Sequence, residues 1–176
     1  MKYNPDIHHR KSIRLKDYDY SKEGMYYITI CTQNRECILG DIVGADSISA
    51  QIKLNDAGNM INNIYLDLVN QIKNIKLHEY IIMPNHLHGI IEICNMPFRA
   101  DMESAPTIGE IIQTFKRYTT IEYIKGVKRG IYKPFDKRIW QHDYFEHIIR
   151  NEKEYYKIIE YIQYNPLNWK KDKYNK

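Results

Sequence analysis

Two short apolar segments joined by a Pro-Asn dipeptide constrain the fold of this chain more than any other feature. The segments are LHEYIIM (77–83) and HLHGIIEI (86–93), and Pro84-Asn85 lies between them. Both have the length and the isoleucine content of buried strands. Pro-Asn is typical of a tight connection. We therefore expect two neighbouring strands here, which places a sheet at the centre of the fold.

Similar patterns predict the other elements. MYYITICTQ (25–33) and CILGDIV (37–43) are expected to be strands, and the intervening NRE fits a hairpin connection. Apolar residues at helical spacing predict helices over 54–74 and 107–126, the second opened by a Thr107–Glu110 capping box. Residues 143–166 are expected to form one or two helices that stop at Pro166.

The element order β-β-α-β-β-α-α favours an α+β fold, with an antiparallel sheet and the helices packed on one face. The 176 residues suit a single domain, flanked by a basic arm (1–20) and a basic tail (167–176). No apolar run has the length of a membrane span. The three cysteines form no CxxC pair, so a reducing cytoplasm is the simplest compartment.

Positive charge is unevenly spread along the chain. Residues 113–139 contain eight Lys/Arg and two acids, although the net charge of the whole chain is only +4. Clustered cations beside aromatic residues suit a nucleic-acid partner. An ordinary solvated basic surface would have the same composition, so charge alone leaves both interpretations open.

Two histidines at the start of the segment 86–93 are candidate metal ligands. Residues two apart on a strand project from the same face, so His86 and His88 would point together and Leu87 would point away. Two imidazoles at this spacing can bind one divalent ion. The alternative is a strand end with two hydrogen-bonded histidines. His142 and His147 are rivals, but a spacing of five does not put them on one helix face.

The last predicted helix carries a second candidate pair. Tyr161 lies at the edge of an apolar stripe, and Asn165 follows four residues later, which makes the two neighbours on one helix face. A phenol and an amide oxygen could therefore face the same point. Taken alone, Tyr161 is equally consistent with a core tyrosine, and Asn165 with a residue that ends the helix before Pro166.

Together, these segments give the chain a family resemblance. YIIMPNHLHGIIEI, TIGEIIQTFKRYT, IWQHDYFEHIIRNEKEY and YIQYNPLNW, in this order, resemble the REP-associated tyrosine transposases of the HUH superfamily of single-strand transposases and nucleases. The resemblance covers residues 10–170. It implies a ferredoxin-like sandwich. It also implies that His86 and His88 are metal ligands, that Tyr161 attacks DNA, and that Asn165 completes the metal site.

The resemblance further implies a nickase that rejoins single-stranded DNA beside hairpins through a 5′-phosphotyrosine, with Mg²⁺ or Mn²⁺ as cofactor. A domesticated hairpin-binding protein and a metal-free structural domain are the alternatives. Related transposases include homodimers, and the sequence leaves monomer and dimer open. The cations expected to contact DNA are Arg10, Lys11, Arg14, Lys116, Arg117, Lys128, Arg129 and Arg138.

Overall fold

The computed structural model describes residues 23–44, 50–94 and 106–175. Its centre is a four-stranded antiparallel sheet with the strand order β4-β5-β1-β6. The strands are β1 (Gly24–Cys31), β4 (Ile75–Met83), β5 (His86–Ile93) and β6 (Phe145–Ile149). The expected neighbours β4 and β5 do pair, and β5 also pairs with β1, so the histidine pair lies on a central strand.

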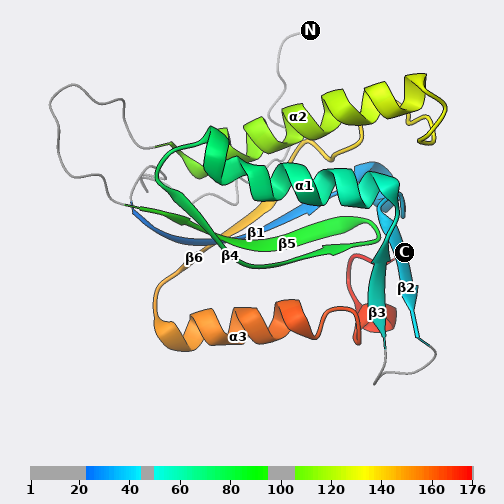
Figure 1. The fold of residues 1–176 in the computed structure, drawn as a ribbon. Helices are drawn as coiled ribbons and strands as arrows, with labels where there is room; N and C mark the ends of the chain where they lie inside the picture. The colour runs from blue at the N-terminus through cyan, green and yellow to red at the C-terminus, as the bar shows by residue number, and fades with distance from the viewer. Residues whose placement is uncertain (1–22, 45–49, 95–105, 176) are drawn as a thin grey trace, which may run out of the picture.

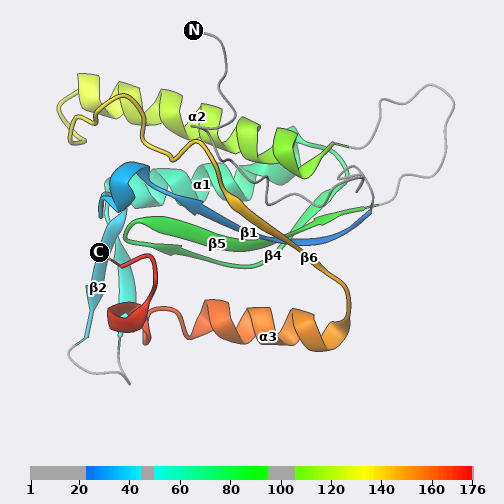
Figure 2. The same cartoon turned by 180° about the vertical axis from the view of Figure 1, so that it is seen from behind.

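Helices cover both faces of this sheet (Figures 1 and 2). α1 (Asp56–Gln71) and α2 (Ile108–Lys128) lie side by side on one face, and α3 (Glu152–Gln163) lies across the other. The order β1-α1-β4-β5-α2-β6 is the ferredoxin-like arrangement. The expected α+β fold with an antiparallel sheet is therefore confirmed.

The expectation that every helix packs on one face is wrong for α3. Alternation along the strands gives each face its own apolar cluster. Leu87 and Ile91 of β5 belong to the larger cluster beneath α1 and α2. Ile90 of β5 packs on the other side with Tyr27 and with Ile162 of α3. The apolar stripe of α3 thus covers the face toward which the even-numbered side chains of β5 point.

Two local predictions need correction. Residues 25–33 and 37–43 do not form a hairpin, because β5 and β6 occupy both edges of β1. Instead β2 (Gly40–Val43) pairs with β3 (Gln51–Leu54) in a separate two-stranded sheet. The segment 143–166 is not wholly helical, since β6 precedes α3 and pairs with β1.

The helix predictions for 54–74 and 107–126 are confirmed as α1 and α2, and the capping box at Thr107 and Glu110 is present. Among the described residues, no helix has the length and apolarity needed to cross a bilayer. Cys31, Cys37 and Cys94 are free thiols.

Candidate active site

Two buried imidazoles face α3 from the beginning of β5. His86 and His88 are both fully buried, and their Nε2 atoms lie 3.0 Å apart. Leu87 between them packs in the larger core on the opposite face. Strand alternation therefore produces the convergence of the two rings that the HxH spacing predicts.

Asn85 fixes the orientation of the first ring. Its Nδ2 donates to the carbonyl oxygens of Arg35 (3.0 Å) and Tyr174 (2.9 Å), so its Oδ1 faces His86 Nδ1 at 2.8 Å. An amide oxygen can only accept, which means that Nδ1 carries the proton. Nε2 of His86 therefore presents a lone pair to the site.

Two hydroxyl groups hold the second ring. His88 Nδ1 lies 2.8 Å from the hydroxyls of both Tyr27 and Thr29, which are neighbours on the same face of β1. These contacts turn Nε2 of His88 toward Nε2 of His86. Strand pairing brings them together, because Thr29 is directly opposite His88 in the β1–β5 register.

Burial keeps both imidazoles neutral near pH 7. Loss of hydration lowers the pKa of His86 and of His88 below the ordinary value of histidine, and the positive charge of Lys173 adds to this effect. The carboxylate of Asp172 acts in the opposite direction on the pKa of His86. Neutral imidazole is the form that binds metal ions.

Asp172 joins the two histidines in a group that the sequence did not predict. One ligand atom from each of His86, His88 and Asp172 lies within 4.8 Å of the other two. Asp172 directly follows a short 3-10 helix (Trp169–Lys171), which brings the chain after α3 back over the histidines. Its only signal in the sequence is that it is the one acid in the lysine-rich tail.

Asn165 supplies a further oxygen near this group. It is only 2% exposed, and its Oδ1 has no hydrogen-bond partner among the described residues. It lines a cavity of about 740 Å³ together with Tyr161 and Asp172. A buried amide oxygen without a partner costs free energy, and its position in a cavity that Asp172 also lines is compatible with the predicted role as a cation ligand.

Tyr161 reaches the histidine pair from α3 of the same chain. Its hydroxyl lies 3.5 Å from His88 Nε2, and the ring centroids of Tyr161 and His88 are 5.2 Å apart. The side chain is 43% exposed. Partial burial raises the pKa of its phenol to about 12, and the negative charge of Asp172 contributes to the increase. The phenol therefore resists ionisation unless positive charge is nearby.

Two known proteins resemble the chain in sequence, although no family model matches it. An uncharacterized protein of Haemophilus influenzae is 44% identical over 184 residues, which cover 97% of this chain and 96% of the relative. The two proteins belong to one family. A second H. influenzae protein, provisionally assigned as a REP-associated tyrosine transposase, is 24% identical over 149 residues, covering 85% of this chain and 73% of its own.

A solved structure shares the fold. It shows a REP-associated tyrosine transposase bound to a REP hairpin, with a TM-score of 0.56 and 18% identity over 90% of this chain and 74% of that chain. This chain is related to the REP-associated tyrosine transposases. The structural likeness, at this identity, supports the shared architecture, and the roles of individual residues depend on the geometry described above.

Tyr161 was the predicted nucleophile, and three other tyrosines lie near it on α3 or directly after it. The hydroxyl of Tyr155 is 3.1 Å from His78 Nδ1, away from the histidine pair. Tyr156 and Tyr164 are 59% and 51% exposed and do not line the cavity. Among these α3 tyrosines, the geometry therefore favours Tyr161.

Tyr27 is the remaining rival in β1. Its hydroxyl is closer to His88 than that of Tyr161, but it contacts Nδ1, on the side of the ring away from His86. Tyr27 is buried in the sheet, and burial raises its pKa well above that of Tyr161. Tyr27 is therefore better placed to orient His88 than to attack a substrate.

The two rival histidines lie outside the candidate metal group. His142 contacts Asp143 at 2.9 Å, and His147 on β6 contacts Glu154 Oε1 at 2.6 Å. Each of the two histidines therefore has a local carboxylate partner.

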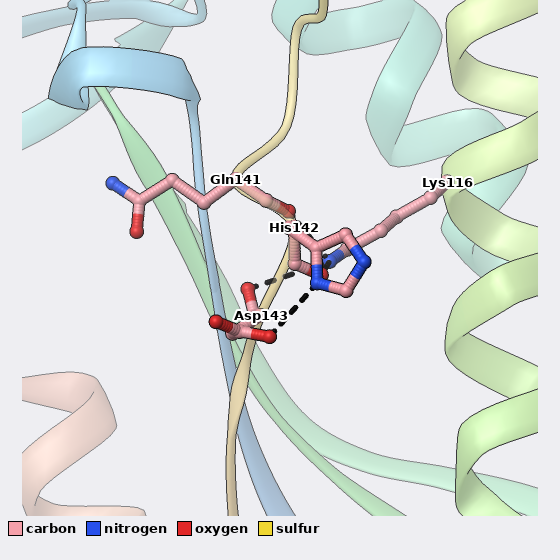
Figure 3. Close-up of polar contacts among 4 residues, drawn as sticks. All are labelled: Lys116, Gln141, His142 and Asp143. Carbon is pink, nitrogen blue, oxygen red and sulfur yellow. Dashed lines mark hydrogen bonds and ion pairs between the residues drawn. The ribbon is translucent and has the colours of Figure 1, made fainter. Parts of the chain in front are cut away.

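The expected DNA-contacting cations are distributed away from the imidazoles. Lys116 Nζ donates to the carbonyl oxygens of Gln141 (2.9 Å), His142 (3.1 Å) and Asp143 (3.5 Å), which ties α2 to the segment before β6 (Figure 3). Burial lowers the pKa of Lys116 to about 8. A phosphate at Lys116 would compete with these carbonyls.

The other predicted contacts are exposed on α2 or follow it. These are Arg117, Lys128, Arg129 and Arg138. Since α2 and α3 cover opposite faces of the sheet, the histidines and these cations are separated by the sheet. Arg10, Lys11 and Arg14 lie outside the described residues.

Proposed function

We propose that this protein is a metal-dependent nickase and strand transferase that acts on single-stranded DNA next to hairpins. The observation that carries the proposal is the approach of the Tyr161 hydroxyl to within 3.5 Å of His88 Nε2. A candidate nucleophile thus lies beside a pair of candidate metal ligands. Because both come from one chain, we propose that the site works without a partner subunit.

The donor set fits a divalent cation. Two neutral Nε2 atoms lie 3.0 Å apart, a separation that one ion can span, and Asp172 and Asn165 offer oxygens. Mixed nitrogen and oxygen ligands suit Mn²⁺ and remain acceptable to Mg²⁺. A bound cation would offset the negative charge that develops on the scissile phosphate and would favour the ionised phenol.

Residues of the chain carry out the attack on DNA and hold the imidazoles in position. Tyr161 Oη forms a bond to the scissile phosphorus while the bond from phosphorus to the 3′ oxygen breaks. The phenol proton passes to solvent, and the departing 3′ oxygen takes up a proton. The product is a 5′-phosphotyrosine and a free 3′-hydroxyl, and reversal of this step rejoins a strand. Asn85, Tyr27 and Thr29 hold the two imidazoles in place throughout.

Hairpin DNA is the proposed partner because a structural relative is bound to a REP hairpin. We propose that the exposed cations of α2 and the segment after it contact the phosphates of the duplex, and that the basic arm adds further contacts. Each neutralised phosphate releases counterions, so the affinity should fall steeply as the salt concentration rises.

The decisive experiment tests for a covalent protein–DNA adduct. Labelled hairpin oligonucleotides with mixed-sequence single-stranded flanks are incubated with Mn²⁺ or Mg²⁺ and separated on a denaturing gel. We expect an adduct with the wild type that disappears with Tyr161→Phe and with EDTA. Tyr164→Phe is the matched control, since Tyr164 lies in the same motif but does not line the cavity.

Two outcomes would contradict the proposal. An adduct that persists in Tyr161→Phe would assign the attack to another residue. A shift of the hairpin in a native gel without any adduct would instead support the alternative, a domesticated hairpin-binding protein that does not cut DNA.

A further inference from the structure

The cavity beside Tyr161 is larger than the attack on a phosphate requires. Its volume is about 740 Å³, within the range of small-molecule binding sites. It extends along α3 from Asn165 and Tyr161 to Glu154. Glu154 and Tyr161 are separated by seven residues, or about 10 Å along the helix. The space therefore continues well beyond Tyr161.

The lining of this cavity includes an aromatic side chain that is exposed to solvent. Phe145 is the first residue of β6 and is 39% exposed. It lies on the side of β6 that faces α3, since it pairs with Thr29 in the register with β1. Its ring contacts the ring of Tyr27 edge-on, with centroids 6.0 Å apart. An exposed ring with a fixed neighbour is a suitable platform for a nucleobase.

Three ammonium groups surround the same space. Lys157 projects from α3, and Lys171 and Lys173 come from the segment after it. All three side chains are exposed. Lys173 Nζ lies 5.6 Å from the centroid of Phe145, so positive charge is adjacent to the aromatic platform.

The two acids that line the cavity already have partners. Glu154 accepts from Arg150 N at 2.8 Å and contacts His147 Nε2 at 2.6 Å. Asp172 accepts from Tyr174 N at 2.6 Å and belongs to the histidine group. The three lysines also outnumber these two carboxylates, so the complementary class of ligand is an anion with a flat apolar part.

We propose that this cavity is a subsite for one unpaired nucleotide adjacent to the scissile phosphate. Its base stacks on Phe145, and its phosphate lies among Lys157, Lys171 and Lys173. This inference rests on the proposed function, because it places the nucleotide relative to the attack by Tyr161. Stacking tolerates any base, so the subsite would set the position of the strand rather than its sequence.

An abasic scan tests the stacking. The probe is a labelled DNA hairpin with a flank of ten thymidines, in which one base at a time is removed, and binding is measured in EDTA by fluorescence anisotropy. With the wild type we expect one flank position where the loss of the base weakens binding about 5- to 150-fold, the effect of stacking one base.

Substitution of the platform should remove that dependence. Phe145→Ala should bind the intact probe as weakly as the wild type binds the abasic probe. The affinity should not fall further when Phe145→Ala is measured with the abasic probe. Phe145→Trp should preserve binding. Tyr156→Ala is the matched control, because it removes an exposed aromatic of α3 that does not line the cavity.

The lysines are tested by the salt dependence. Lys157→Gln should reduce the slope of log affinity against log salt by about 0.7, the value for one single-strand phosphate contact. Lys153→Gln, an exposed lysine of α3 outside the cavity, should leave the slope unchanged.

The proposal is overturned if no flank position shows an abasic effect or if that effect persists in Phe145→Ala. Such a result together with a Tyr161-dependent adduct would contradict the proposed subsite but would support the proposed nickase activity. If Phe145→Ala abolishes the abasic effect as expected but no adduct forms, the nucleotide subsite is supported and the proposed nicking activity is contradicted.

Discussion

The packing of Tyr65 against Gly89 holds the histidine strand against the helix layer. Gly89 follows His88 on β5, and Tyr65 of α1 fills the space that a side chain would occupy. A Cβ at position 89 would collide with the Tyr65 hydroxyl and would approach Tyr65 Cζ to 3.2 Å and Tyr80 Cβ to 3.4 Å. Tyr65 is fully buried, and its hydroxyl has no partner among the residues that the structure describes.

These contacts predict a strong coupling between two substitutions. Gly89→Ala should lower the free energy of unfolding by about 1–3 kcal/mol, the usual cost of overpacking. Tyr65→Phe should raise it by about 1 kcal/mol, because a buried unpaired hydroxyl is removed. The double variant should lie within about 1 kcal/mol of Tyr65→Phe, since the colliding oxygen is gone. For a Gly89→Ala cost of about 2 kcal/mol, the middle of that range, the coupling energy is about 1–2 kcal/mol, above the roughly 0.3–0.5 kcal/mol scatter of independent sites.

Urea denaturation followed by circular dichroism measures all four proteins of the cycle. In thermal melts, each kcal/mol should shift the midpoint by about 2–4 °C for a chain of this size. Tyr80→Phe is the matched control, because the Tyr80 hydroxyl donates to Asn62 at 2.9 Å and its loss should destabilise. If Tyr65→Phe destabilises as Tyr80→Phe does, or if the two changes are additive, the reasoning about this contact is refuted.

Three further predictions concern the site and its supports. Asn85→Ala removes the acceptor that orients His86, and we expect calorimetry to show about 10- to 100-fold weaker Mn²⁺ binding. Burial lowers the pKa of His86 and His88 in the folded protein. Below about pH 6.5 these two histidines therefore bind protons in the unfolded chain while they stay neutral in the folded protein. The stability of the metal-free protein should fall as the pH drops from there, and less so in His86→Gln. Burial also lowers the pKa of Lys116 from 10.5 to about 8, so the unfolded chain binds more protons between these values. Wild-type stability should therefore rise by about 3 kcal/mol relative to Lys116→Met from pH 8 to 10.5, measured by urea denaturation.

Local sequence patterns were sufficient for the centre of the fold and for the histidine pair. Alternation in 86–93 placed both imidazoles on one face, because a strand leaves no other choice for residues two apart. The capping box and helical spacing located α2 for a similar reason. In these segments local propensity and tertiary packing favour the same structure.

The errors occurred where a tertiary partner decides the conformation. Residues 145–149 are a strand because they pair with β1, and nothing within FEHII excludes a helix. The hairpin expected between 25–33 and 37–43 did not form, since both edges of β1 are occupied by distant strands. Asp172 was missed because its approach to the histidines depends on how the chain turns after α3.

The groups of the candidate site have one electrostatic property in common, which is that a cation would interact favourably with each of them. The Nε2 atoms of His86 and His88 lie next to a carboxylate and a phenol whose pKa is about 12, and these two groups line one cavity with an amide oxygen that has no partner among the described residues. The imidazole nitrogens, the two oxygens and the ionised phenol would all interact favourably with a positive charge placed among them. Lys173 provides some positive charge, but it also helps to keep the imidazoles unprotonated. A divalent cation would be bound by the imidazoles in their neutral form and would lower the pKa of the phenol at the same time. Metal binding and activation of the nucleophile are therefore expected to be one event in this site.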